Sequence, residues 1–175
     1  LSQEPNGLVF TLKPLPADPT ATTPLAESLT ERNQAFWASA RPALERLSST
    51  REESNTERHY LRNYYARPLT HWGVVLQRAG SLTNAAPAFQ LALRLNPNSD
   101  QARANLEFNA ELGALNAGKS LTVPDFNQLP PLRSGFKTWD DLLLMNGPFD
   151  SPVFTAQISQ VFSQGGNYRQ SLAEL

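Results

Sequence analysis

Apolar residues recur every three or four positions over much of this chain, which is the spacing that places them on one face of a helix. The first such stretch spans Ser28–Ser48, and its apolar stripe consists of Phe36, Trp37, Ala40, Leu44 and Leu47. Ser28 and Glu31 have the spacing of a capping box, so we expect the helix to begin there. Pro42 lies inside the stretch and predicts a kink or a break at Arg41.

A second helical stretch, Glu57–Tyr65, leads into the most regular part of the chain, residues 66–99. Pro68 is compatible with the first turn of a new helix. Gly80 can take a positive φ and predicts the end of that helix, and Pro97 predicts the end of the next one. Because Pro87 is tolerated near a helix start, the second helix is expected to begin near Thr83 or Asn84.

Small and large residues within this stretch predict how its two helices pack. Gly73 and Ala92 would let the helices approach closely, and Phe89 would fill the space between them. The pattern therefore predicts a pair of antiparallel helices with Phe89 at their interface.

The rest of the C-terminal half alternates between helical patterns and loop signals. Asp100–Asn116 has helical periodicity behind a cap at Ser99, and residues 117–137 hold three prolines that predict a long loop. Thr138 starts a short helix that ends at Asn146-Gly147-Pro148, and Pro152–Gly166 is expected to be one more helix.

The first 27 residues have a different pattern. Leu8, Phe10 and Leu12 alternate with Val9, Thr11 and Lys13, which predicts a short strand or extended arm. A proline-rich linker follows over residues 15–24. Since a lone strand is only marginally stable, we expect the arm either to lie along the helices or to pair with a part of the protein outside this chain.

Composition narrows the functional classes. The net charge of −1 gives no bulk attraction to nucleic acid, and the absence of cysteine excludes disulfides and thiolate metal sites. No apolar run reaches the roughly 18–20 residues that span a bilayer, so no membrane insertion by this segment is expected. The chain starts at Leu1 without Met, which suggests a piece of something longer.

No residue cluster has a convincing catalytic spacing. His59 and His71 are 12 residues apart, whereas two metal ligands on one helix would be expected at i and i+4. The adjacent carboxylates Glu52-Glu53 and Asp140-Asp141 point apart if helical and favour loop charge or capping. We therefore expect no metal, no cofactor and no enzyme activity within this segment. Five aromatic residues could form either part of the core or a patch that binds a ligand. They are Trp37, Tyr60, Tyr64, Tyr65 and Trp72.

Residues 66–99 resemble one tetratricopeptide (TPR) repeat, a helix–turn–helix unit of 34 residues. The matching positions are Gly73, Gly80, Ala85, Phe89, Ala92 and Pro97. The resemblance implies an all-α fold of TPR-like hairpins stacked as a short array, with an extended N-terminal arm and a long Pro-rich insertion. The expected units are an arm and linker over 1–27, N-terminal helices over 28–65, a repeat over 66–99, a degenerate repeat with an inserted loop over 100–150, and the start of another over 151–175.

In such an array the first helix of each unit lines a concave face that can bind a protein or peptide. The residues predicted on this face are Arg67, Thr70, Val74, Gln77, Gln101, Asn105 and Phe108. An Arg among amide side chains suits a peptide backbone or carboxylate. The alternative is that these residues are solvated and that the array acts as a spacer or scaffold.

Most of the chain also resembles the C-terminal tail of bacterial multi-spanning membrane proteins that are similar to protein O-mannosyltransferases and end in TPR repeats. The matching segments are 7–12, 35–37, 65–80, Trp139, 146–150 and 162–170. This resemblance implies a membrane-embedded, glycosyltransferase-like part before Leu1 and a location on the extracytoplasmic (periplasmic) side. A soluble cytoplasmic adaptor is the alternative.

Overall fold

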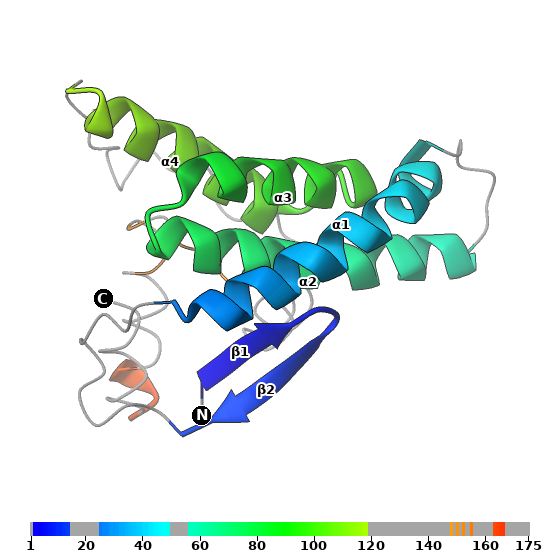
Figure 1. Cartoon of the computed structure of the whole chain (residues 1–175), viewed down its shortest axis with the longest axis horizontal. Coiled ribbons are helices and arrows are strands. Elements are labelled where there is room, and N and C mark those ends of the chain that lie inside the picture. The colour runs from blue at the N-terminus through cyan, green and yellow to red at the C-terminus, as the bar shows by residue number, and fades with distance from the viewer. Residues whose placement is uncertain are drawn as a thin grey trace.

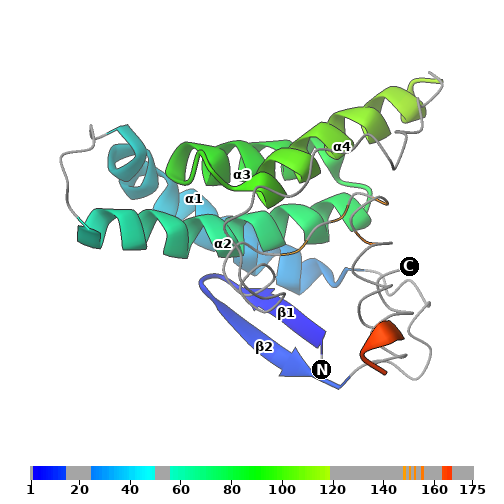
Figure 2. The same cartoon turned by 180° about the vertical axis from the view of Figure 1, so that it is seen from behind.

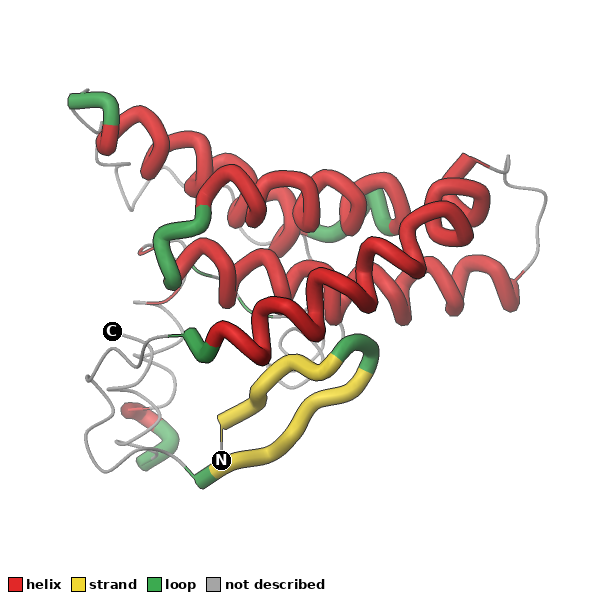
Figure 3. The backbone as a smooth tube through the Cα atoms, in the orientation of Figure 1, coloured by secondary structure: helices red, strands yellow, loops and turns green. Residues whose placement is uncertain are grey.

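A computed structural model describes residues 2–14, 25–49 and 56–118, together with Pro148, Asp150, Pro152, Thr155 and residues 163–166. Its described part is mostly helical, with one small sheet (Figure 1; Figure 3). The elements are β1 (Ser2–Asn6), β2 (Val9–Lys13), α1 (Glu27–Ser49), α2 (Thr56–Arg78), α3 (Leu82–Leu95) and α4 (Asp100–Asn116).

Helices α2 and α3 are the centre of the helical part, because each of them contacts the other three helices. Helix α1 runs obliquely across α2, and the two strands lie on the side of α1 and α2 that faces away from α3 (Figure 1; Figure 2). The core fills the space between the helices, with Trp37, Leu69, Trp72, Phe89 and Leu95 among its buried side chains. Within the described ranges, no helix combines the length and apolar character needed to cross a membrane.

The predicted arm is one half of a β-hairpin. β2 pairs antiparallel with β1, and Asn6 lies opposite Val9 across a two-residue turn. Gly7 has a φ of +63° and Leu8 has a negative φ, as the first and second turn positions of a type II′ hairpin require. Of the two predicted alternatives, the structure shows the arm lying along the helices, where β2 pairs with β1 and β1 contacts α1 and α2. The polar sequence of β1, with Pro5 inside it, gave no periodic signal.

The start predicted for α1 is wrong. The carbonyl oxygen of Ala26 already accepts hydrogen bonds from the N–H groups of Leu29 and Thr30, so the helix begins before Ser28. Of the two alternatives predicted at Arg41, a kink or a break, the break is not observed, because α1 continues as one helix through Pro42. Trp37 and Leu44 are buried on either side of that proline, and their burial stabilises the uninterrupted helix.

Helix α2 is likewise one helix where two were predicted. It spans Thr56–Arg78 with Pro68 in its interior. A proline inside a helix costs about 3 kcal/mol or more. Buried side chains flank Pro68 on both sides, namely Ala66, Leu69, Trp72 and Leu76. Each buried large apolar side chain contributes about 1.5–3 kcal/mol, so their burial outweighs the proline.

The predicted turn at Gly80 is confirmed. Gly80 has a φ of +76°, its N–H donates to the carbonyl of Gln77, and the N–H of Ser81 donates to the carbonyl of Leu76. These two bonds form a Schellman motif that satisfies the last carbonyls of α2. Helix α3 then begins at Leu82, one residue before the predicted range, so Pro87 lies in its second turn and not its first.

Close packing of α2 against α3 is also confirmed. A Cβ atom built on Gly73 would lie 2.4 Å from Cε1 of Phe89, so this position has no room for a side chain. Phe89 and Ala92 have no exposed surface. The helix predicted over 100–116 is observed, and the Ser99 hydroxyl accepts a hydrogen bond from the N–H of Ala102 as its cap. Residues 119–137 of the predicted loop and the helix after Thr138 lie outside the described residues, as does most of the helix predicted over 152–166.

Candidate functional site

The seven residues of the predicted concave face come from α2 and α4, which contact each other. Contrary to the expectation of an open surface, five of them are buried: Thr70, Val74, Gln77, Gln101 and Asn105. Phe108 and Arg67 remain partly exposed. The space between α2 and α4 is therefore largely closed in this structure. Pro148 and Asp150 of the same chain contact α2 and α4 there.

Asn105 binds the backbone of a distant segment with both ends of its side-chain amide. Its Nδ2 donates to the carbonyl oxygen of Pro148 at 2.8 Å, and its Oδ1 accepts from the N–H of Asp150 at 2.7 Å. The side-chain amide of Asn105 thus pairs with a backbone carbonyl and a backbone N–H two residues apart. A residue of a neighbouring parallel β-strand pairs with the same two backbone groups. We use the name α2–α4 groove for the polar surface that Gln77 and Arg78 of α2 and Asn105 of α4 present to Pro148 and Asp150.

The Asp150 carboxylate is held by the end of α2. Nε2 of Gln77 donates to its Oδ2, and Nε of Arg78 donates to its Oδ1, each at 2.6 Å. The carboxylate side chain is 10% exposed and the Arg78 side chain is 49% exposed. A largely covered carboxylate thus pairs with a half-exposed guanidinium, an arrangement stronger than a neutral hydrogen bond.

Two more polar atoms in this region are buried without a hydrogen-bond partner among the described residues. They are Oε1 of Gln77 and Nδ2 of Asn109. Asn109 lies one helical turn after Asn105 on the same face of α4. Unpaired buried polar atoms carry a desolvation penalty, which a bound ligand could relieve.

Arg67, predicted to grip a ligand, instead contacts the hairpin. Its guanidinium lies 5.7 Å from the centre of the Phe10 ring, and the same ring packs 4.7 Å from the ring of His71. These contacts fix β2 against α2. Burial, reinforced by the nearby charges of Arg78 and Arg67, lowers the pKa of His71 to about 4.

The His71 shift predicts a loss of stability in mild acid. The unfolded chain takes up a proton near pH 6.5 and the folded chain only near pH 4, so stability is complete above 6.5 and falls as pH drops toward 4. Between pH 7.5 and 5.5 we expect His71 to lower the free energy of unfolding by about 1.4 kcal/mol. Urea unfolding at the two pH values measures this difference.

The variants His71→Gln and His59→Gln separate this effect from other titrations. His59→Gln is the control for replacing a histidine, because His59 lies exposed on the same helix. His71→Gln should remove about 1.4 kcal/mol of the pH dependence. Equal pH dependence in wild type and His71→Gln would contradict the assignment.

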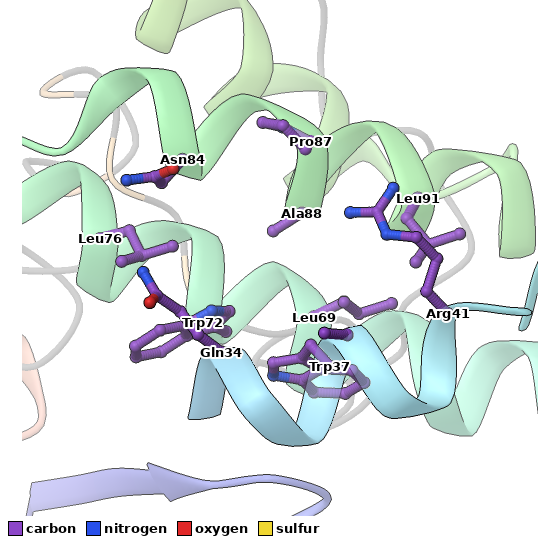
Figure 4. Close-up of a pocket in the computed structure, with 11 residues that line it drawn as sticks. Gln34, Trp37, Arg41, Leu69, Trp72, Leu76, Asn84, Pro87, Ala88 and Leu91 are labelled. Carbon is purple, nitrogen blue, oxygen red and sulfur yellow. The ribbon is translucent and has the colours of Figure 1, made fainter. Parts of the chain in front are cut away.

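A separate, mainly apolar cavity of about 320 Å³ lies between α1, α2 and α3 (Figure 4). It is lined by Gln34, Trp37, Ala38, Arg41, Leu69, Trp72, Leu76, Asn84, Pro87, Ala88 and Leu91. Of the predicted aromatic group, Trp37 and Trp72 are buried core residues, whereas Tyr60 and Tyr64 are exposed. The five aromatics therefore do not form one patch.

Among the described residues, no group of three or more His, Asp or Glu side chains could hold a metal ion. Glu52-Glu53 and Asp140-Asp141 lie outside the described residues. The sequence pattern missed Arg78 of the groove, Asn109 beside it and Asp150 of the segment that contacts it. Of these three, only Arg78 could have been suggested by the sequence. It directly follows Gln77, a predicted binding residue, at the end of the same helix.

Comparison with models of known protein families, with curated proteins and with solved structures found no match.

Proposed function

We propose that this chain is a non-catalytic binding module of the TPR type, which holds an extended polypeptide segment in the α2–α4 groove. In this proposal α2–α3 is one helical hairpin, and α4 begins a second unit stacked beside it. The first helices of the two units, α2 and α4, then line the groove together. The observation that carries the proposal is the two-point hydrogen bonding of Asn105 to the backbone at Pro148 and Asp150.

The spacing of the amides on α4 supports an extended ligand. Asn105 and Asn109 are four residues apart, which corresponds to about 6 Å along a helix. Two residues of an extended chain span about 6.6 Å. A partner longer than the chain's own segment could therefore meet Asn109 Nδ2 with its next carbonyl. Recognition of main-chain groups suits a module that binds segments of varied sequence.

A peptide-binding experiment tests the proposal. The probe is a fluorescein-labelled peptide, NGPFDSP, which copies residues 146–152 of the chain. The receptor is the full chain with Asp150→Pro, which removes the Asp150 N–H and carboxylate and so frees the groove. We expect saturable binding by fluorescence anisotropy, weakened about ten-fold or more by adding Asn105→Ala, because each unpaired buried group costs about 1–3 kcal/mol.

Asn63→Ala is the matched control, because Asn63 lies in the N-terminal half of α2 and bonds only to the exposed His59 among the described hydrogen bonds. It should leave the affinity unchanged. Circular dichroism confirms that each variant is folded. Absence of binding, or equal binding with and without Asn105→Ala, overturns the proposed groove.

A further inference from the structure

The α2–α4 groove already holds a ligand-like segment of the same chain. Pro148 and Asp150 lie 43 and 45 residues after Asn105, so the contact does not follow from local chain geometry. The segment is held through one backbone carbonyl, one backbone N–H and one carboxylate. These are the groups that an extended acidic peptide would offer.

We propose that this segment is an intramolecular mimic of the partner, and that the partner is an extended polypeptide with an Asp or Glu at the position of Asp150. The inference rests on the proposed function, since it identifies the ligand class and the regulation of the same groove. The partner binds by displacing the chain's own segment, so the free protein is self-inhibited.

The contacts at Asp150 account for the acidic preference. Gln77 and Arg78 donate N–H groups to two different oxygens of the carboxylate, at 2.6 Å each. An asparagine in its place would offer one oxygen and one NH2 group, so an N–H would face an N–H at one of the two contacts. The side chain is 10% exposed, which leaves little water to compensate for that mismatch.

The same geometry permits exchange with a partner. Arg78 is half exposed, so the carboxylate end of the groove is open to an incoming acidic residue. A tethered segment competes at an effective concentration on the order of 1 mM. A free peptide with an intrinsic Kd of about 100 µM would therefore bind the self-occupied groove about ten-fold more weakly than the freed groove.

The test compares two labelled peptides on the full chain. The peptides are NGPFDSP and NGPFNSP, which differ only at the acidic position, and the receptors are wild type and Asp150→Pro. We expect NGPFDSP to bind Asp150→Pro about ten-fold more tightly than wild type. It should also bind Asp150→Pro about ten-fold more tightly than NGPFNSP does.

A pair of arginine variants in the Asp150→Pro background checks the charge contact. Arg78→Met should reduce the affinity for NGPFDSP more than that for NGPFNSP, because it removes the charged partner of the carboxylate. Arg103→Met is the matched control, because Arg103 pairs with Asp100 at the start of α4, outside the groove lining, and should change neither affinity.

The outcomes separate the two proposals. Equal binding of NGPFDSP to wild type and Asp150→Pro overturns the self-inhibition while the peptide-binding function stands. Equal affinity of the two peptides for Asp150→Pro overturns the acidic preference. Binding of neither peptide to either chain overturns the proposed function, and this inference with it.

Discussion

Replacing Gly73 with leucine is expected to destabilise the protein by about 3 kcal/mol or more, because it forces a side chain into the space of a buried ring. A Cβ at this position already lies 2.4, 2.7 and 2.8 Å from three atoms of Phe89. Phe89 is fully buried, so its ring has no exposed space into which to rotate. Gly73→Ala should be destabilising as well, by about 1–2 kcal/mol after its gain in helix propensity. Chemical denaturation measures both values.

Gly113→Ala is the matched control for this prediction. Gly113 also lies within a helix, but a Cβ there meets nothing within 4 Å. The substitution should stabilise the protein by about 0.5–1 kcal/mol through helix propensity alone. A Gly73→Leu variant that unfolds at the same denaturant concentration as wild type would refute the packing of α2 on α3.

Removing the Asn33 side chain is expected to detach the β-hairpin and to cost about 2–3 kcal/mol. Asn33 has no exposed surface and joins α1 to β1 and to the hairpin turn. Its Nδ2 donates to the carbonyls of Pro5 and Leu29, and its Oδ1 accepts from the N–H of Gly7. In Asn33→Ala these hairpin groups lose a buried partner. A two-stranded hairpin without its support is only marginally stable.

Hydrogen exchange measures the detachment directly. In Asn33→Ala the amides of β1 and β2 should exchange much faster, while those of α3 should accelerate only as far as the loss of global stability requires. Gln34→Ala serves as the control, because Gln34 is exposed on the same helix. Unchanged protection of Val9–Lys13 in Asn33→Ala would show that the hairpin is held by other contacts.

Local sequence patterns were sufficient to predict the turn between α2 and α3 and the close packing of these two helices. Gly73, Gly80 and Phe89 each have a role that depends on neighbours within one helical hairpin, so their spacing predicted the turn and the close approach. The helix boundary predicted at Pro68 is wrong for the opposite reason, and so is the break that was the alternative to a kink at Pro42. The local cost of a proline was correctly identified, but the burial that outweighs it comes from contacts between helices, which no local pattern contains.

The β-hairpin and the α2–α4 groove could not be predicted from local sequence, because both are formed by contacts between residues far apart in the chain. β1 is polar and contains Pro5, and it is held by Asn33, which lies 28 residues later. Likewise Thr70, Gln77 and Asn105 were correctly assigned to facing helices, but their burial could not be predicted from α2 and α4 alone. Asp150 reaches the groove from 45 residues beyond Asn105, and nothing in its local sequence indicates that contact.

The most direct test of the α2–α4 groove as a polypeptide-binding site is the NMR signal of the Asn105 side-chain amide in the full chain. In wild type its protons should exchange slowly and give nuclear Overhauser effects to Pro148 and Asp150, which lie at hydrogen-bond distance. In Asp150→Pro the signal should shift and exchange faster, and adding NGPFDSP should restore slow exchange. A signal that is the same in both proteins and does not respond to the peptide would contradict the account.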